Sequence, residues 1–361
     1  MLKRLHLRNF TVFAEANFEF GPGLNVIVGT NGTGKSHVLK VGYAGIRSLI
    51  ENIHDWNGFN SDSPLSSLVR IFRPVPEELS ELIRRQAKPI QAIVQYELED
   101  ERVSPVQLIL MPELSTESRL VITPPSSLNE IQHVNTAPVF IPAKEVFTQS
   151  WMLPASEQLR LRIDETYLDL LKQLRGIPLK LIEPSSIAAI NSLSTVIGGE
   201  VEEEDGRYYL SASKNKRMEM NMVAEGLRKF GTLQKLLANG SLSPKSILFW
   251  DEPEANLNPA LLRKLAAILA ELARQGFQII LATHSMSLLK EFHILSRQKD
   301  ATPLPIKYFG LNAGPGEATR IVTSDNFEYL PDVVALEAEL EQADELDEIF
   351  AKEDRAHHAN L

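Results

Sequence analysis

The 361-residue chain contains no cysteine. This absence excludes disulfide bonds, thiolate metal ligands and cysteine nucleophiles, and it agrees with a reducing cytoplasm, which we expect as the location. No stretch reaches the ~18 uninterrupted apolar residues that a membrane-spanning helix needs, so we expect no membrane-embedded part. The opening segment, MLKRLHLRNF, has neither an apolar core nor a small-residue cleavage site, so it does not resemble a secretory signal.

An excess of positive charge is also missing. The formal net charge is −10, and residues 332–355 alone contribute −8, with ten acidic side chains against Lys352 and Arg355. The rest of the chain carries only −2, so the total charge neither predicts nor excludes a groove for nucleic acid. With 43% hydrophobic and 23% charged residues, the composition is that of a folded globular protein.

Short, almost wholly apolar runs are present, and they are typical of strands buried on both faces of a sheet. Segments with helical spacing lie between them, and this alternation predicts a parallel α/β core. The runs are 24–28, 247–250 and 277–282, and the expected helices are 37–50, 225–237 and 259–274.

Other segments predict additions to this core. Strands are expected at 2–7, 16–20, 90–98, 106–111, 119–123 and 139–141, of which 90–123 suggest an antiparallel subsheet. A helix is expected from Pro76 to about Lys88, an irregular insert at 51–70, and a hairpin at 198–210 that turns at Asp205-Gly206. We expect four parts: an N-terminal part of the α/β domain with the antiparallel subsheet (1–150), a helical arm or lid (151–196), a C-terminal part of the same domain (197–330) and an acidic tail (331–361).

The strongest motif is GTNGTGKS at residues 29–36, which satisfies G-x-x-x-x-G-K-[ST] between an expected strand and an expected helix. The glycines let the backbone wrap closely around a polyphosphate, so that N–H groups and the helix N-terminus face its negative charge. Lys35 is expected to reach the β- and γ-phosphates of ATP, and the Ser36 hydroxyl to bind Mg²⁺. The candidate nucleotide-binding residues here are Gly29, Asn31, Gly32, Thr33, Gly34, Lys35, Ser36 and His37.

A second candidate set follows two of the buried strands. Strand 247–250 runs into Asp251 and Glu252, and two carboxylates at the end of a buried strand are costly unless they meet a metal or hydrogen-bond donors. Asp251 is expected to support Mg²⁺, and Glu252 to orient and deprotonate the attacking water. His284 follows strand 277–282, at the same edge of the sheet, where it is expected to contact the γ-phosphate.

Together these residues resemble the ABC-type ATPase heads of the SMC, RecF and OLD group, often described as "AAA family ATPases". Segment 251–259, DEPEANLNP, resembles the Walker B motif and D-loop of that group, and 283–285 its switch histidine. Segment 223–229, VAEGLRK, resembles its degenerate signature. Leu7-Arg8-Asn9-Phe10 is similar to its first strand, which implies that Arg8 and Asn9 also contact the nucleotide.

The sequence departs from this group at two positions. Ala224 stands where the signature has serine, and segment 141–145, IPAKE, contains no glutamine where the Q-loop is expected. Lys144 or Glu145 are the candidates to replace that glutamine. Either departure predicts slow hydrolysis.

The resemblance implies a P-loop NTPase fold and a head-to-tail homodimer that holds two ATP molecules between its subunits. Ala224, Glu225 and Gly226 would then face the nucleotide of the partner subunit. We expect ATP binding to close this dimer and hydrolysis to reopen it. The favoured role is an ATP-gated scaffold or sensor for a separate effector protein, as in bacterial anti-phage or toxin modules. The alternative is a DNA-binding clamp that resembles RecF.

Overall fold

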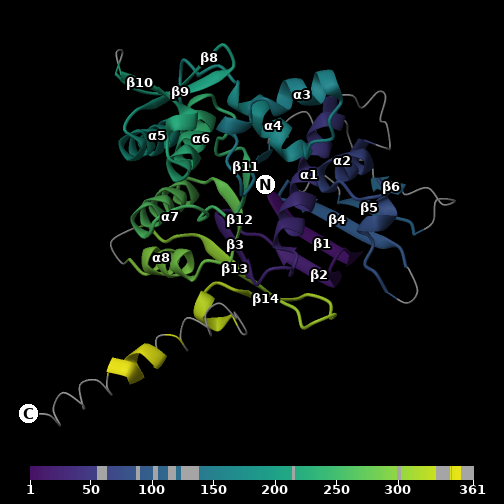
Figure 1. Cartoon of the computed structure of the whole chain (residues 1–361). Coiled ribbons are helices and arrows are strands. Elements are labelled where there is room, and N and C mark those ends of the chain that lie inside the picture. The colour runs from purple at the N-terminus through teal and green to yellow at the C-terminus, as the bar shows by residue number, and fades with distance from the viewer. Residues whose placement is uncertain are drawn as a thin grey trace, which may run out of the picture.

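The computed structural model describes residues 1–54, 63–86, 90–100, 105–112, 119–122, 138–213, 216–298, 302–330, 342 and 344–350 (Figure 1). A six-stranded sheet lies at its centre, in the order β14-β13-β3-β12-β11-β7. All neighbours pair in parallel except β14, which pairs with β13 in antiparallel fashion at the edge. The strands are β3 (Leu24–Gly29), β7 (Pro138–Ile141), β11 (Ile247–Asp251), β12 (Gln278–Thr283), β13 (Ile306–Asn312) and β14 (Arg320–Ser324). The predicted parallel core is confirmed.

Both faces of this sheet are buried, which explains why its strands are so uniformly apolar. Along β11, Leu248 and Trp250 belong to one hydrophobic cluster, while Ile247 and Phe249 belong to the cluster on the opposite face. Strand β12 alternates in the same way. Because successive side chains of a strand point to opposite faces, a strand covered on both sides needs apolar residues throughout.

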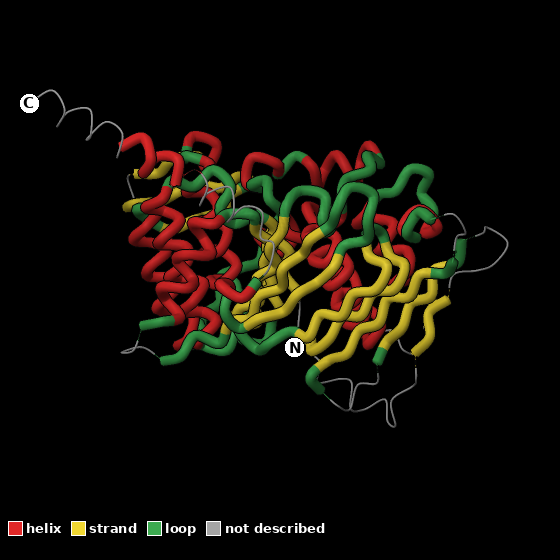
Figure 2. The backbone as a smooth tube through the Cα atoms, turned by 90° about the horizontal axis from the view of Figure 1, so that it is seen from below, coloured by secondary structure: helices red, strands yellow, loops and turns green. Residues whose placement is uncertain are grey.

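A second, antiparallel sheet has the order β2-β1-β4-β5-β6 and confirms the predicted subsheet. Its strands are β1 (Leu2–Phe10), β2 (Phe13–Glu19), β4 (Ala92–Leu98), β5 (Val106–Leu110) and β6 (Arg119–Ile122). Thr123, the expected end of the last strand, lies outside the described residues. In Figure 2 the strands of the two sheets lie side by side, and a group of helices flanks them on one side.

Helix α1 (Lys35–His54) packs between the two sheets. Two glycines permit this arrangement. A Cβ atom at Gly42 would lie 2.9 Å from Cε1 of Phe249 on β11, and one at Gly45 would lie 2.2 Å from Cε1 of Tyr96 on β4. Any larger residue at Gly45 would therefore force α1 and the antiparallel sheet apart.

The sequence interpretation of segment 51–86 is wrong in two places. Helix α1 continues to His54, and α2 (Ser63–Phe72) occupies much of the expected irregular insert. The serines of α2 make the segment look polar, but Leu65, Leu68 and Ile71 form an apolar stripe and are buried. Residues 55–62 lie outside the described part.

The helix expected from Pro76 is only the 3-10 turn η2 (Leu79–Leu82). The backbone of this segment pairs with the end of β1 instead. The carbonyl of Leu82 accepts from the N–H of Thr11 at 2.8 Å, and Ile83 forms a β-bridge with Phe10. Lys88, the expected end of this helix, lies outside the described residues.

Helices cover the face of the parallel sheet opposite α1 (Figure 1). The helical content expected at 151–196 is confirmed, and these helices pack on the body: α4 contacts β7, and α5 contacts α6 and α7. The four-part division of the chain stays a prediction. The elements are η4 (Phe147–Gln149), α3 (Met152–Leu159), α4 (Glu165–Leu174), α5 (Pro184–Ile197), η5 (Met220–Met222), α6 (Glu225–Ala238), α7 (Pro259–Arg274), α8 (Met286–Ser296) and η6 (Phe327–Tyr329).

A small three-stranded sheet lies beside α6: β8 (Glu200–Glu204), β9 (Arg207–Ser213) and β10 (Lys216–Glu219). The predicted hairpin is confirmed, because Asp205 and Gly206 connect β8 and β9 with φ values of 52° and 76°. Of the acidic tail, the structure describes a short helical stretch at 344–350, and nearly all of the remainder lies outside the described residues. Over the described part of the chain, no helix combines the length and apolarity needed to cross a membrane.

Candidate functional site

The Gly-rich loop connects β3 to α1, as the motif requires. Gly32 and Gly34 adopt left-handed conformations, with φ values of 84° and 91°. A Cβ atom at Gly34 would also lie 2.5 Å from Cγ2 of Val12, so the turn between β1 and β2 packs directly on the loop. Glycine is therefore required at position 34 both by conformation and by close packing.

Lys35 holds this loop closed. Its Nζ donates to the carbonyl of Gly29 at 2.8 Å and to that of Thr30 at 3.0 Å. The side chain is buried, and burial lowers the pKa of Lys35, while the carboxylates of Glu252 and Asp251 act in the opposite direction. The ammonium thus bonds to two carbonyls of the Gly-rich loop itself, and its contact with a phosphate stays a prediction.

The other loop residues differ in exposure. Asn31 and Gly32 are exposed, whereas Thr33 is buried and its Oγ1 donates to the carbonyl of Thr30 at 2.8 Å. His37 is half-buried against the ring of Phe72, and burial lowers its pKa. The contact of His37 with a nucleotide stays a prediction.

Arg8 and Asn9 end the strand β1, close to the turn that packs on Gly34. Arg8 is exposed. Asn9 has a φ of 51°, and its Nδ2 donates to the carbonyl of Gln91 at 3.4 Å. The contact of both residues with nucleotide stays a prediction, because the residues of this region that pack on Gly34 are Val12 and Phe13.

Asp251 lies against the start of α1. The Ser36 hydroxyl donates to its carboxylate, and burial is the main cause that raises the pKa of Asp251. The Oδ1 atom is buried and has no hydrogen-bond partner among the described residues. The two residues expected to bind Mg²⁺ are therefore in contact, and one carboxylate oxygen is free to accept a donor or a metal.

Glu252 and His284 meet at the ends of the neighbouring strands β11 and β12. The Oε1 atom of Glu252 lies 3.4 Å from Nδ1 of His284. The backbone of Glu252 is left-handed, with a φ of 45°, and its N–H donates to the carbonyl of Ala282 at 2.9 Å. Both side chains are partly exposed, so they line the accessible edge of the sheet.

Sequence reasoning gave no role to Glu254, although the structure buries it at this site. Its Oε1 accepts from the hydroxyl of Thr283 at 2.6 Å and from the backbone N–H of His284 at 3.2 Å. Glu254 thus fixes the turn that carries His284. The only signal was a third acidic residue close to Asp251 and Glu252, and its partners lie about thirty positions further along the chain.

The segment that resembles the signature begins α6. Ala224 is the N-cap residue and provides no side-chain acceptor, and both Ala224 and Glu225 are exposed. Gly226 is buried, and a Cβ atom there would lie 2.7 Å from the carbonyl oxygen of Asn256. The Nδ2 of Asn256 donates to Oε1 of Glu225 at 2.7 Å. The signature and the D-loop are therefore joined, while their outer side stays open.

Segment 141–145 follows β7, the neighbour of β11 in the sheet. Its two candidates for the missing glutamine differ. Lys144 is exposed, whereas Glu145 forms an ion pair with Arg228 of α6 at 2.7 Å. Arg228 also donates to the carbonyl of Val223 at 2.7 Å. The Glu145 carboxylate is thus committed to the signature helix.

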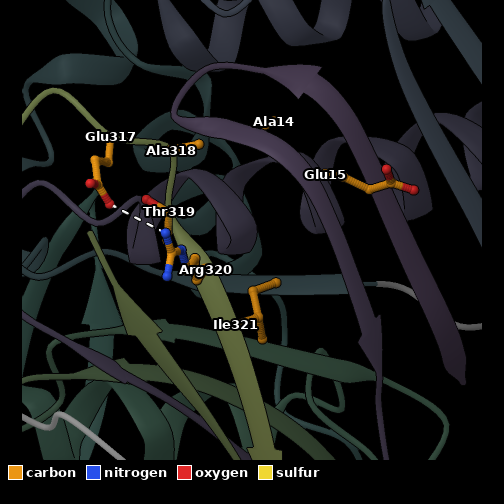
Figure 3. Close-up of a pocket in the computed structure, with 7 residues that line it drawn as sticks. All are labelled: Ala14, Glu15, Glu317, Ala318, Thr319, Arg320 and Ile321. Atoms are coloured by element: carbon orange, nitrogen blue, oxygen red, sulfur yellow. Dashed lines mark ion pairs between the residues drawn. The ribbon is translucent and has the colours of Figure 1, made fainter. Parts of the chain in front are cut away.

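A shallow pocket of about 560 Å³ lies between β2 and the segment that leads into β14 (Figure 3). Ala14 and Glu15 line one side, and residues 317–321 line the other, where Glu317 and Arg320 form an ion pair at 3.6 Å. Its lining includes no residue of the Gly-rich loop. We therefore place the candidate site at the loop and not in this pocket.

The model of a protein family described as "AAA domain, putative AbiEii toxin, Type IV TA system" matches residues 24–290, well over half of the chain. This match spans the Gly-rich loop, the signature, Asp251, Glu252 and His284. The chain belongs to this AAA-domain family. A second AAA-domain model matches residues 4–40.

Individual proteins support the same assignment. A 39-residue segment is 56% identical to the DNA replication and repair protein RecF of Magnetococcus marinus, and it spans 11% of this chain and 10% of that protein. The SMC head domain of Thermotoga maritima superposes with a TM-score of 0.52 at 16% identity, covering 90% of this chain and 98% of the other. An SMC head bound to the C-terminal winged-helix domain of ScpA gives a TM-score of 0.53 at 14% identity, covering 91% and 98%. The resemblance to SMC and RecF-like ATPase heads, and the P-loop NTPase fold, are confirmed.

As an AAA-domain protein, the chain belongs to a family whose P-loop implies a nucleotide and, typically, Mg²⁺, and Ser36 and Asp251 are the residues that would hold this ion. Among the described residues, no cluster of three or more His, Asp or Glu side chains is arranged to hold a metal alone. Ser36 and Asp251 would supply only two ligands, which suits Mg²⁺, because this ion commonly binds one or two protein groups together with phosphates and water. Mg²⁺ bound there would offset the negative charge of the phosphates.

Proposed function

We propose that this chain hydrolyses ATP as a head-to-tail homodimer and thereby gates a separate effector protein. The observation that carries the ATPase assignment is the arrangement at one edge of the sheet, where Ser36 contacts Asp251 and Glu252 contacts His284. In this arrangement Lys35 holds the phosphates, and Glu252 orients and deprotonates the attacking water. His284 is the candidate contact of the γ-phosphate.

The proposed dimer rests on the signature segment. Ala224 and Glu225 are exposed at the start of α6, where backbone N–H groups and the helix dipole favour a negatively charged ligand. We place the nucleotide of the partner subunit at this position. Because Ala224 supplies no hydroxyl, the N–H groups of the helix start must make these contacts, and we expect slow turnover.

Two of the comparisons support the proposal of a separate effector protein. The family description refers to a toxin of a type IV toxin–antitoxin system, and the SMC head discussed above was solved with a domain of its partner ScpA. By analogy, the ATP-bound dimer of this chain holds a separate effector and releases it after hydrolysis. Anti-phage defence is the context that we favour.

Light scattering of the Glu252→Gln variant tests the dimer. Without its base, the chain should retain ATP, and Mg-ATP should raise the mass from 40.4 kDa to about twice that value. The matched control is the double variant Glu252→Gln with Lys35→Ala, which should remain a monomer in Mg-ATP. A mass that ignores ATP in the single variant would contradict the sandwich dimer.

A second candidate function is a DNA-binding clamp, which the 56% identical segment of RecF favours. The same trapped variant decides between the two. A salt-sensitive shift of duplex DNA that requires Mg-ATP would support the clamp. Recovery of one protein with the ATP-bound dimer, together with no DNA shift, would support the scaffold.

A further inference from the structure

Lys229 is a cation buried beneath the candidate site. It lies on α6 as the last residue of the signature segment, and only 2% of its surface is exposed. Its Nζ donates to the backbone carbonyl of Glu252 at 3.0 Å. A contact therefore joins the signature helix directly to the residue that we propose as the base.

This contact is not required to satisfy the carbonyl. The N–H of Ala255 already donates to the same oxygen atom of Glu252 at 3.1 Å. Burying a lysine carries a desolvation cost, and burial lowers the pKa of Lys229 to about 8. The carboxylates that face it, Glu254, Glu225, Glu252 and Asp251, offset only part of this cost. An apolar residue of similar length would satisfy the fold at lower cost, so folding alone does not explain the lysine.

The contact acts on a residue with a constrained backbone. Glu252 has a φ of 45°, which non-glycine residues adopt only where their surroundings enforce it. Its N–H is held by the carbonyl of Ala282 on β12, and its carbonyl is held by Lys229 on α6. A displacement of α6 relative to β12 would therefore turn the peptide groups on either side of Glu252.

The helix α6 begins at Glu225, one turn before Lys229, and Glu225 is exposed. Glu225 and Gly226 contact Asn256, as described above, and the exposed side of the segment is where we place the nucleotide of the partner subunit. A second copy that engages this segment pushes on α6 close to Lys229. Lys229 thus links the signature segment, where we place the partner subunit, to Glu252, the proposed base.

We propose that Lys229 is a positioning residue that couples engagement of the signature segment by a second copy to the orientation of Glu252. This inference rests on the proposed function, because it requires an ATP-dependent dimer. The cation acts through the main chain of Glu252 and does not itself touch the reacting atoms. Its loss should slow hydrolysis within the dimer without preventing dimer formation.

The test compares Lys229→Met with the wild-type chain. Lys235→Met is the matched control, because Lys235 lies on the same helix and is 5% exposed, with Glu203 and Glu202 as its acidic neighbours instead of Glu252. We expect Lys229→Met to lower kcat about 10²-fold with little change in KM, since small misplacements of a catalytic group have effects of this size. Lys229→Arg, which keeps the charge and the donor, should recover part of this loss.

Two further measurements separate positioning from folding. The apo melting temperature of Lys229→Met should stay within a few degrees of the wild type, and Lys229→Met in the Glu252→Gln background should still double its mass in Mg-ATP. Unchanged kcat in Lys229→Met would overturn the inference, and so would loss of the dimer. If Lys229→Met does not fold, Lys229→Arg takes its place. Values of kcat and KM in Lys229→Arg that match the wild type would support the need for a cation at position 229. A kcat as low as that of the unfolded Lys229→Met would overturn the inference. A wild-type chain that neither dimerises nor hydrolyses ATP would instead refute the proposed function, and this inference with it.

Discussion

Two groups of buried charges in this molecule differ in how completely they are paired. The first group joins α1 to α4: Arg47 lies 2.7 Å from Glu165 and 3.2 Å from Asp169, whose carboxylate also accepts from the Tyr43 hydroxyl at 2.8 Å. The second group lies at the end of β11, where Asp251 keeps a buried oxygen without a partner among the described residues.

Of the acids Glu165, Asp169 and Asp251, only Glu165 has a lowered pKa. Burial favours the protonated form of Glu165, but hydrogen bonds from Arg47 and Arg70 outweigh it and lower the pKa of Glu165. At Asp251 burial dominates and raises the pKa, and burial likewise raises the pKa of Asp169 in the first group despite the nearby Arg47. The carboxylates of the α1–α4 group thus accept hydrogen bonds from Tyr43, Arg47 and Arg70, whereas the Asp251 carboxylate keeps one buried oxygen without a donor in the described part of the chain, as a ligand-binding site requires.

The largest effect on stability is expected for a substitution that disrupts the α1–α4 group. Arg47→Met removes the cation shared by two buried carboxylates, and we expect it to lower the free energy of unfolding by about 3–5 kcal/mol. Urea unfolding of the apo protein measures this. Arg70→Met is the control, because 47% of that side chain is exposed, and it should cost no more than about 1 kcal/mol. Equal effects of the two substitutions would show that the Arg47 pairs are worth no more than surface pairs.

A pH titration tests the cation of the second group. The pKa of Lys229 is about 8 in the folded chain against 10.5 in the unfolded chain, so the lysine carries its full penalty below pH 8 and none above pH 10.5. The unfolding free energy of the wild type relative to Lys229→Met should therefore rise between these values, by about 3 kcal/mol. A flat difference across this range would show that Lys229 is not desolvated.

The smallest effect on stability is expected for a substitution of Asp251. Asp251→Asn removes a carboxylate whose charge is disfavoured by burial, and its amide oxygen can still accept from Ser36. We expect the metal-free protein to gain about 1 kcal/mol of stability, measured by urea unfolding in EDTA, while stabilisation by Mg-ATP is lost. A loss of stability in the metal-free protein would place Asp251 with the paired group.

Much of the core was predictable because local patterns coincide with the fold. Helix α7 was predicted with its observed bounds, since Asn258 caps it through the N–H of Leu261 and Pro259 occupies its first turn. The Asp205-Gly206 turn was equally clear. In contrast, β13 and β14 were missed, because Ile306–Asn312 mixes apolar and polar residues and becomes a strand only by pairing with β3.

The site shows the same division. Lys35 and Ser36 were identified from one contiguous motif. Lys229 and Glu254 were not, because their partners are distant in the sequence: Lys229 bonds to Glu252, and Glu254 to Thr283. One local signal was available for Lys229. It lies on the buried stripe of α6 with Gly226, Phe230 and Leu233, and a lysine in that pattern calls for a buried acceptor.

The seating of α1 has a consequence for how this site can vary. The helix contacts one sheet at Gly42 and the other at Gly45, where ring atoms of Phe249 and Tyr96 pack closely against its backbone. A shift of α1 along its axis would therefore bring bulkier residues of the helix against these two rings. We therefore expect substitutions in the Gly-rich loop, and not a shift of α1, to change the affinity of the proposed site for nucleotide.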